Sequence, residues 1–129
     1  MHPFERLMVE DSRFDEQLLG EALEEYVGIG RESGRLIWKR GRKGVSARRR
    51  LVAYLLVRIP LCRLGLCEEE WATPKAVEQA TGVPGGTVRR TLRELQREGL
   101  AQNEGGRYRV APFALVDAVG VLKGGDARD

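Results

Sequence analysis

The stretch that decides the fold is TPKAVEQATGVPGGTVRRTLRELQREGLAQNEGGRYRV, residues 73–110. It begins with Thr73 and Pro74, a pair typical of a helix start, with a hydroxyl side chain at the N-cap and proline at the first helical position. Gly82 and Pro84 predict that this helix is short, because glycine suits a left-handed C-cap and proline cannot continue a helix.

A second helix is predicted from about residue 86 to residue 98. Its apolar residues Val88, Leu92 and Leu95 are spaced i, i+4 and i+7, so they share one face. A turn of about 100° per residue then places basic side chains on the opposite, outward face. These are Arg90, Arg93 and Arg97, with Arg89 on the flank.

Gly99 is expected to end this helix, and a hairpin is predicted to follow. Two short runs, 100–104 and 107–110, flank the turn residues Gly105 and Gly106. Helix, turn, helix and hairpin in this order resemble the winged helix-turn-helix family of prokaryotic and archaeal transcriptional regulators. The resemblance covers residues 73–110 and implies that the second helix enters the major groove of double-stranded DNA, with the hairpin as a wing on the DNA backbone or minor groove.

The resemblance and the arginine row together predict the DNA-binding residues. They are Thr87, Arg89, Arg90, Arg93 and Arg97 on the second helix, and Arg107 and Arg109 on the wing. The start of the helix departs from the family, since Gly85 and Gly86 stand where side chains usually contact the groove. Backbone N–H groups bind phosphate but read no base, so we expect modest sequence specificity.

Charge is strongly segregated along the chain. Residues 1–32 carry nine acidic and three basic side chains, whereas residues 33–63 carry ten basic and no acidic ones. The net charge of +3 hides this pattern, which points to an electrostatic partner. A solvated basic surface without a partner is the alternative.

Two further basic groups are predicted to contact phosphates. Lys39, Arg40, Arg42 and Lys43 lie in a glycine-rich arm without acidic neighbours. Arg48, Arg49 and Arg50 lie in the first turn of a helix predicted to start at Ser46 and to end at Pro60. Positive charge there opposes the helix dipole, so stability alone does not explain these three arginines.

The helix from Ser46 is predicted to bury Val52, Leu55, Leu56 and Ile59. Residues 61–72 are expected to form a connector, in which residues 68–70 suit one turn of helix and Trp71 packs on the core. Cys62 and Cys67 are interpreted as small apolar residues beneath this loop, with a disulfide as the alternative.

Both ends of the chain are predicted to be helical. Residues 12–27 have an S-x-x-D start at Ser12 and Asp15, and an apolar stripe that packs on the core or on a second copy. Between the arm and this helix, residues 36–38 suit a short strand. Residues 113–122 are apolar on most sides, which predicts burial in the core or in a homodimer interface.

The sequence therefore predicts a mainly α protein with a small β-hairpin wing. Its segments are an N-terminal helix and basic arm (1–45), a winged helix-turn-helix (46–111) and an apolar C-terminal helix with a tail (112–129).

Several classes of function find no support in the sequence. The only histidine is His2, and there is no catalytic triad, phosphate-binding loop or metal-ligand cluster, so no enzymatic activity, cofactor or metal is expected. Neither a membrane span nor a signal peptide is recognisable, which predicts a cytoplasmic, nucleoid-associated protein.

The favoured interpretation is a double-stranded DNA-binding transcriptional regulator that forms a homodimer through residues 113–122, 12–27 or both. The alternatives are a non-sequence-specific architectural DNA binder and a winged-helix protein-interaction subunit of a nucleic-acid complex. RNA binding has little support, because aromatic residues make up only 6% of the chain.

Overall fold

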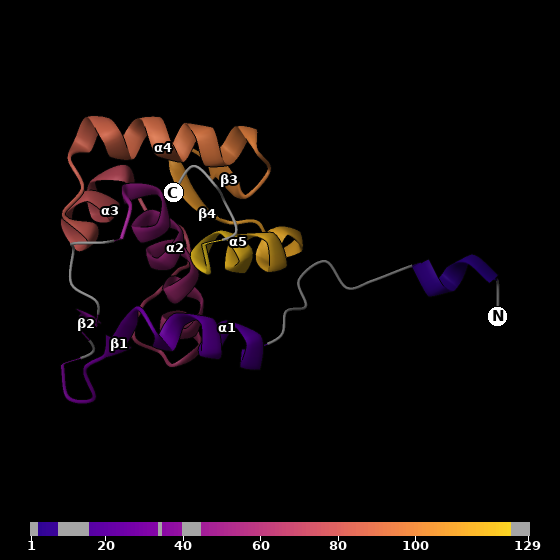
Figure 1. Cartoon of the computed structure of the whole chain (residues 1–129), viewed down its shortest axis with the longest axis horizontal. Coiled ribbons are helices and arrows are strands. Elements are labelled where there is room, and N and C mark those ends of the chain that lie inside the picture. Colours follow the sequence, from indigo (N-terminus) through magenta and orange to yellow (C-terminus); the bar gives the residue numbers. More distant parts are fainter. Residues whose placement is uncertain (1–2, 8–15, 34, 40–44, 125–129) are drawn as a thin grey trace.

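The computed structural model describes residues 3–7, 16–33, 35–39 and 45–124, and within them the protein is mainly helical with two small antiparallel two-stranded sheets (Figure 1). The elements in order are η1 (Pro3–Leu7), α1 (Glu16–Glu24), β1 (Val27–Ile29), β2 (Leu36–Trp38), α2 (Ala47–Arg63), α3 (Pro74–Thr81), α4 (Gly85–Arg97), β3 (Ala101–Glu104), β4 (Arg107–Val110), η2 (Pro112–Ala114) and α5 (Leu115–Leu122).

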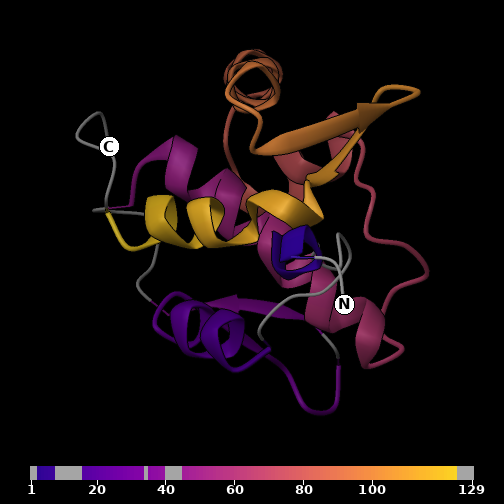
Figure 2. The same ribbon diagram turned by 90° about the vertical axis from the view of Figure 1, so that its right-hand side faces the viewer.

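Helix α2 is the centre of the fold. Ser46 caps it by accepting a hydrogen bond from the Arg49 backbone N–H at 3.2 Å. The sequence predicted one buried face, but every residue from 51 to 57 is buried, since α1, α3, α4, α5 and β4 all contact this helix. Figure 2 shows α2 and α5 between α1 on one side and α4 on the other.

The prediction that Pro60 ends α2 is wrong, because the helix continues to Arg63. A proline removes one backbone hydrogen bond from a helix, a cost that tertiary packing can offset. Ile59 and Leu61 on either side of Pro60 are both buried, and the Leu64 N–H still bonds to the Pro60 carbonyl at 2.9 Å.

Helices α3 and α4 have the predicted starts and ends to within about one residue. The Thr73 hydroxyl accepts a hydrogen bond from the Ala76 N–H, and Gly82 adopts a left-handed conformation with φ of 74°. At the end of α4, Gly99 has φ of 80°, and the Leu100 N–H bonds back to the Leu95 carbonyl at 2.9 Å. This arrangement at the end of the helix is a Schellman motif, in which glycine is the usual residue at the left-handed position.

The hairpin after α4 is confirmed as β3 and β4, with Ala101 opposite Val110 and Glu104 opposite Arg107. Gly105 and Gly106 both have positive φ, as a two-residue turn between twisted strands requires. The sequence did not predict that Ala72 pairs with Tyr108 through two backbone hydrogen bonds of 2.8 Å. Residues 68–70 form no helical turn.

The N-terminal part joins the same core. Helix α1 ends at Glu24 rather than at residue 27, and Val27 begins β1, a strand that the sequence did not predict. The strand at residues 36–38 is confirmed as β2, and the Trp38 indole N–H donates to the Ala80 carbonyl at 3.1 Å. Ser12 and Asp15 lie outside the described residues.

The C-terminal helix is confirmed, preceded by the short helix η2. Five residues of α5 are buried within the chain, mainly against α2: Leu115, Ala118, Val119, Val121 and Leu122. Phe113 and Val116 are 71% and 68% exposed, so only this edge of the segment is available to a second copy. The three segments 1–45, 46–111 and 112–129 therefore contribute to a single hydrophobic core.

Candidate nucleic-acid interface

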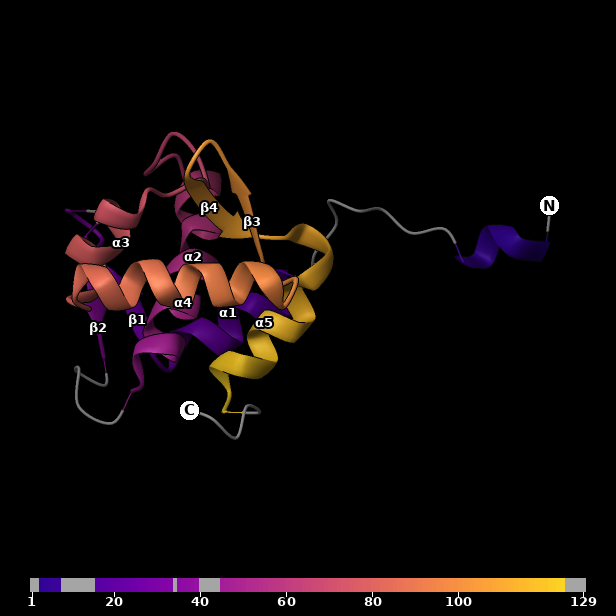
Figure 3. The same ribbon diagram turned by 90° about the horizontal axis from the view of Figure 1, so that it is seen from above.

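Helix α4 has one fully buried and one fully exposed side. Val88, Leu92 and Leu95 are 0%, 0% and 1% exposed, as their spacing predicted. Arg89, Arg90, Arg93 and Arg97 are all exposed. Figure 3 looks down on α4 and shows that no other element covers this side of the helix.

These four arginines have no protein partner within the described part of the chain. Their side chains form neither a hydrogen bond nor an ion pair there, although Glu94 lies on the same helix. A guanidinium group has five N–H donors in a planar fork, which matches phosphate oxygens and the acceptor edge of guanine. The outward side of α4 is therefore a row of available cationic donors.

Thr87 and the start of α4 adjoin the start of α2. Thr87 is half-buried, and it lines a hollow between the start of α2 and the part of α4 that runs from Thr87 to Glu94. The other residues of this hollow are Ser46, Ala47, Arg48, Arg90, Thr91 and Glu94. Donor side chains predominate here, and Glu94 supplies a single carboxylate.

The first turn of α4 is less open to an anion than the sequence indicated. Pro84 precedes the helix and provides no side-chain cap, so the first backbone N–H groups have no such acceptor. However, a Cβ atom added to Gly85 would lie only 2.9 Å from the Glu78 carboxylate. This carboxylate therefore lies beside the positive end of the helix dipole and competes with an incoming phosphate.

The three arginines at the start of α2 are bound to the protein itself. Arg48 forms a two-pronged ion pair with Glu98, with one contact of 2.9 Å between Nη1 and Oε2. Arg49 Nη2 donates to the Leu122 carbonyl at 2.9 Å, and Arg50 Nη1 donates to the Thr81 carbonyl at 3.2 Å.

These contacts give the three arginines a structural role that the argument from sequence did not consider, while their predicted phosphate contacts stay a prediction. Leu122 is the last residue of α5 and Thr81 is the last residue of α3. Arg49 and Arg50 thus satisfy carbonyl groups at the negative ends of two other helices. The sequence argument considered only the dipole of the helix that carries them.

The hairpin arginines face the connector between α2 and α3. Arg107 Nη1 lies 2.6 Å from Glu69 Oε1, and Arg109 Nη1 lies 3.8 Å from Glu70 Oε2. The Arg109 guanidinium also stacks over the Trp71 ring at 4.4 Å. Sequence reasoning missed Glu69 and Glu70 as partners, although an acidic run near a basic hairpin was visible in the sequence.

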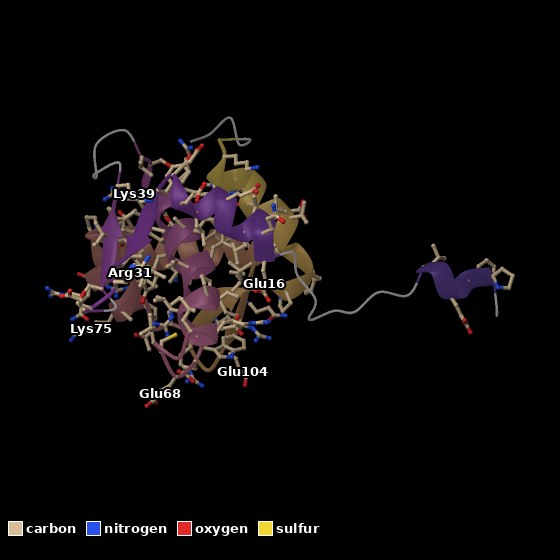
Figure 4. All side chains as sticks on the ribbon, turned by 90° about the horizontal axis from the view of Figure 1, so that it is seen from below. Glu16, Arg31, Lys39, Glu68, Lys75 and Glu104 are labelled. Carbon is tan, nitrogen blue, oxygen red and sulfur yellow. The ribbon has the colours of Figure 1, made fainter. Side chains whose placement is uncertain are left out.

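The basic arm is described only at Lys39, which is exposed and directly follows β2. Figure 4 shows Lys39 beside the β1–β2 hairpin, and Figure 1 places this hairpin across α2 from α4. Arg40, Arg42 and Lys43 lie outside the described residues, so their predicted phosphate contacts stay a prediction.

Neither a metal site nor a membrane-spanning helix occurs in the described ranges. Residues 3–7, 16–33, 35–39 and 45–124 hold no group of three or more His, Cys, Asp or Glu side chains arranged to bind a metal ion. None of the helices in these ranges is both long enough and apolar enough to span a membrane.

Comparison with known proteins adds no relative, since no family model, curated protein or solved structure matches this chain.

Proposed function

We propose that the protein binds double-stranded DNA through the exposed side of α4, as a winged helix-turn-helix protein. In this proposal α3 and α4 form the helix-turn-helix, and the β3–β4 hairpin is the wing. The observation that carries the proposal is the row of four exposed arginines on one helix face, none with a partner among the described residues. Such a row is suited to a polyanion.

The dimensions of α4 suit the major groove. A helix with side chains is about 10–12 Å across, and the major groove of B-DNA is about 12 Å wide. Arg89, Arg90 and Arg93 would lie in the groove with Thr87 near its floor, while Arg97 would contact the backbone. Arginine bound to guanine by two hydrogen bonds discriminates by about 1–3 kcal/mol per base pair.

The wing arginines would exchange one anionic partner for another. Arg107 and Glu69 are 41% and 47% exposed, and an ion pair at such a surface contributes about 0–1 kcal/mol. DNA phosphates can therefore replace the carboxylates of Glu69 and Glu70 at small cost.

The other basic residues divide into two groups. Lys39, Arg40, Arg42 and Lys43 are proposed to form an arm that neutralises phosphates outside the groove contacted by α4. Arg48, Arg49 and Arg50 are not needed for the proposed interface, because they bind Glu98 and the carbonyls of Leu122 and Thr81, and their phosphate contacts stay a separate prediction.

A cytoplasmic, nucleoid-associated transcriptional regulator is the role we favour. Architectural binding without strong sequence preference is the second candidate, and a specific observation supports it. Gly85 and Gly86 leave the first turn of α4 without side chains, so base reading depends on Thr87 and the arginines alone.

We also propose a homodimer, formed at the edge of the C-terminal helix. Phe113 and Val116 present exposed apolar surface there, and the N-terminal helix predicted at residues 12–27 is the other candidate. Sedimentation at micromolar concentration is expected to give a dimer that Val116→Asp converts to a monomer. A wild-type monomer would remove the dimer from the proposal.

The test of the function is duplex-DNA binding measured over a series of salt concentrations, with a random-sequence pool and single-stranded RNA as comparators. Tight duplex binding that falls steeply with salt, together with a palindromic motif enriched from the pool, supports the regulator. Steep binding without a motif supports the architectural role. No duplex binding at moderate salt contradicts both and leaves an acidic protein as the partner of α4.

A further inference from the structure

The two cysteines of the chain lie side by side at the end of α2. Cys62 is in the last turn of the helix and Cys67 is in the connector that follows. Their Sγ atoms are 2.6 Å apart, within about 0.6 Å of an S–S bond of roughly 2.05 Å. Both residues are half-buried, so a small reagent can reach them.

The backbone explains why the two sulfur atoms meet. Gly65 has φ of 75°, its N–H bonds to the Cys62 carbonyl at 3.1 Å, and the Leu66 N–H bonds to the Leu61 carbonyl at 2.8 Å. This Schellman motif reverses the chain directly after the helix. Cys67 is thereby returned to the last turn of α2.

Arg58 holds the returning segment in place from within α2. Its Nη2 donates to the Glu69 carbonyl at 2.6 Å and to the Trp71 carbonyl at 3.2 Å. Cys67 Sγ also lies 3.5 Å from the Glu69 carbonyl oxygen. The connector backbone is thus held to α2 on both sides of Cys67.

We infer that Cys62 and Cys67 are a reversible dithiol–disulfide site, oxidised within one chain by a small-molecule disulfide such as oxidised glutathione. The thiolate of Cys67 attacks one sulfur of the small disulfide and expels one thiolate, which leaves a mixed disulfide on Cys67. Cys62, after losing its proton, attacks Cys67 Sγ and expels the second thiolate. The two cysteines lose two electrons and two protons, and the small disulfide is reduced to two thiols.

The order of attack follows from the surroundings of Cys62. Burial, together with the hydrogen bond and charge of Cys67, raises the pKa of Cys62 to about 12. Cys62 therefore keeps its proton near neutral pH and is a poor first nucleophile. This favours Cys67 for the first attack and Cys62 for the resolving step.

The bond would close a small ring across the end of α2. The connector in this ring leads directly to Glu69 and Glu70, whose carboxylates pair with Arg107 and Arg109. Oxidation would therefore fix the segment that presents both carboxylates to β4. The site itself does not depend on the proposed DNA binding.

The test is thiol exchange on the full chain, incubated at micromolar concentration with mixtures of reduced and oxidised glutathione and then blocked with an alkylating reagent. Intact mass should show the loss of two hydrogen atoms, no alkylation, no glutathione adduct and no covalent dimer, all reversed by dithiothreitol. Cys62→Ser should instead accumulate a glutathione adduct on Cys67, because the resolving thiol is missing.

The inference is overturned if the wild-type chain keeps both thiols alkylatable across the series. It is equally overturned by a stable glutathione adduct on the wild type, or by disulfide-linked dimers. These outcomes are read on the wild-type chain, so they do not depend on whether the serine variant folds.

Discussion

The arginines of α4 and those at the start of α2 have the same chemistry but different surroundings. Arg90, Arg93 and Arg97 are exposed and have no partner among the described residues, whereas Arg49 and Arg50 donate to carbonyl groups that end α5 and α3. In the sequence both groups are dense runs of positive charge, and both were predicted to contact DNA. The difference teaches that a basic run in a sequence has two explanations, contacts within the fold or an anionic ligand, and that the fold is needed to separate them.

The largest expected effect concerns the two sides of α4. Leu92→Ala removes a side chain that is 0% exposed, and leucine-to-alanine changes in cores cost about 2–5 kcal/mol in the free energy of unfolding. Arg93→Ala, one residue along on the exposed side, should change it by less than about 0.5 kcal/mol. Urea unfolding followed by circular dichroism measures both. Similar losses from the two changes would mean that α4 is packed on both sides.

The next effect compares the two arginine groups directly. Arg49→Ala removes the hydrogen bonds to the Leu122 carbonyl and the Tyr26 hydroxyl. Each bond from a charged donor is worth roughly 1.5–3 kcal/mol, but water can replace part of both at this half-buried site, so the free energy of unfolding should fall by about 2 kcal/mol. Arg90→Ala is the matched control, because its side chain has no partner in the described ranges and should leave stability unchanged. An Arg49→Ala protein as stable as the wild type would show that the contacts of Arg49 do not stabilise the fold, and Arg49 would then resemble the exposed arginines of α4.

The smallest effect concerns the hairpin, whose arginines have partners, as those of α2 do, but at an exposed surface, as on α4. Glu69→Gln removes the carboxylate beside Arg107, and it should tighten duplex-DNA binding by about 1 kcal/mol or less while changing stability little. Fluorescence anisotropy at low salt measures the affinity. Glu68→Gln removes the same charge from an exposed residue of the same connector, and so shows how much of any gain is a general charge effect. Equal gains from both changes would show that the Arg107 pair does not restrain the wing.

The sequence predicted the parts of the fold that local chemistry determines. Thr73 with Pro74, Gly82, and the pair Gly105 and Gly106 each specify a cap or a turn through their own backbone preferences, and all three features are present. The spacing of Val88, Leu92 and Leu95 likewise determines which side of α4 is exposed.

The features that the sequence did not predict depend on residues far apart in the chain. Arg49 meets a carbonyl 73 residues away, and Arg58 meets the connector that returns past it. Pro60 stays helical because neighbouring elements bury the residues beside it, and the pairing of Ala72 with Tyr108 requires the whole hairpin to be in place. None of these partners can be identified from local periodicity, since each requires the packed arrangement.

The most direct test of the central claim is the salt dependence of duplex-DNA binding by two double variants. Arg90→Ala with Arg93→Ala removes two charges from the exposed side of α4. Arg31→Ala with Arg35→Ala removes two charges from exposed residues around the β1–β2 turn, across α2 from α4 (Figure 1). The account predicts that only the first pair weakens binding strongly and makes the slope of log affinity against log salt shallower by about two. Equal changes for both pairs would contradict it, because binding would then follow net charge rather than the arginine row of α4.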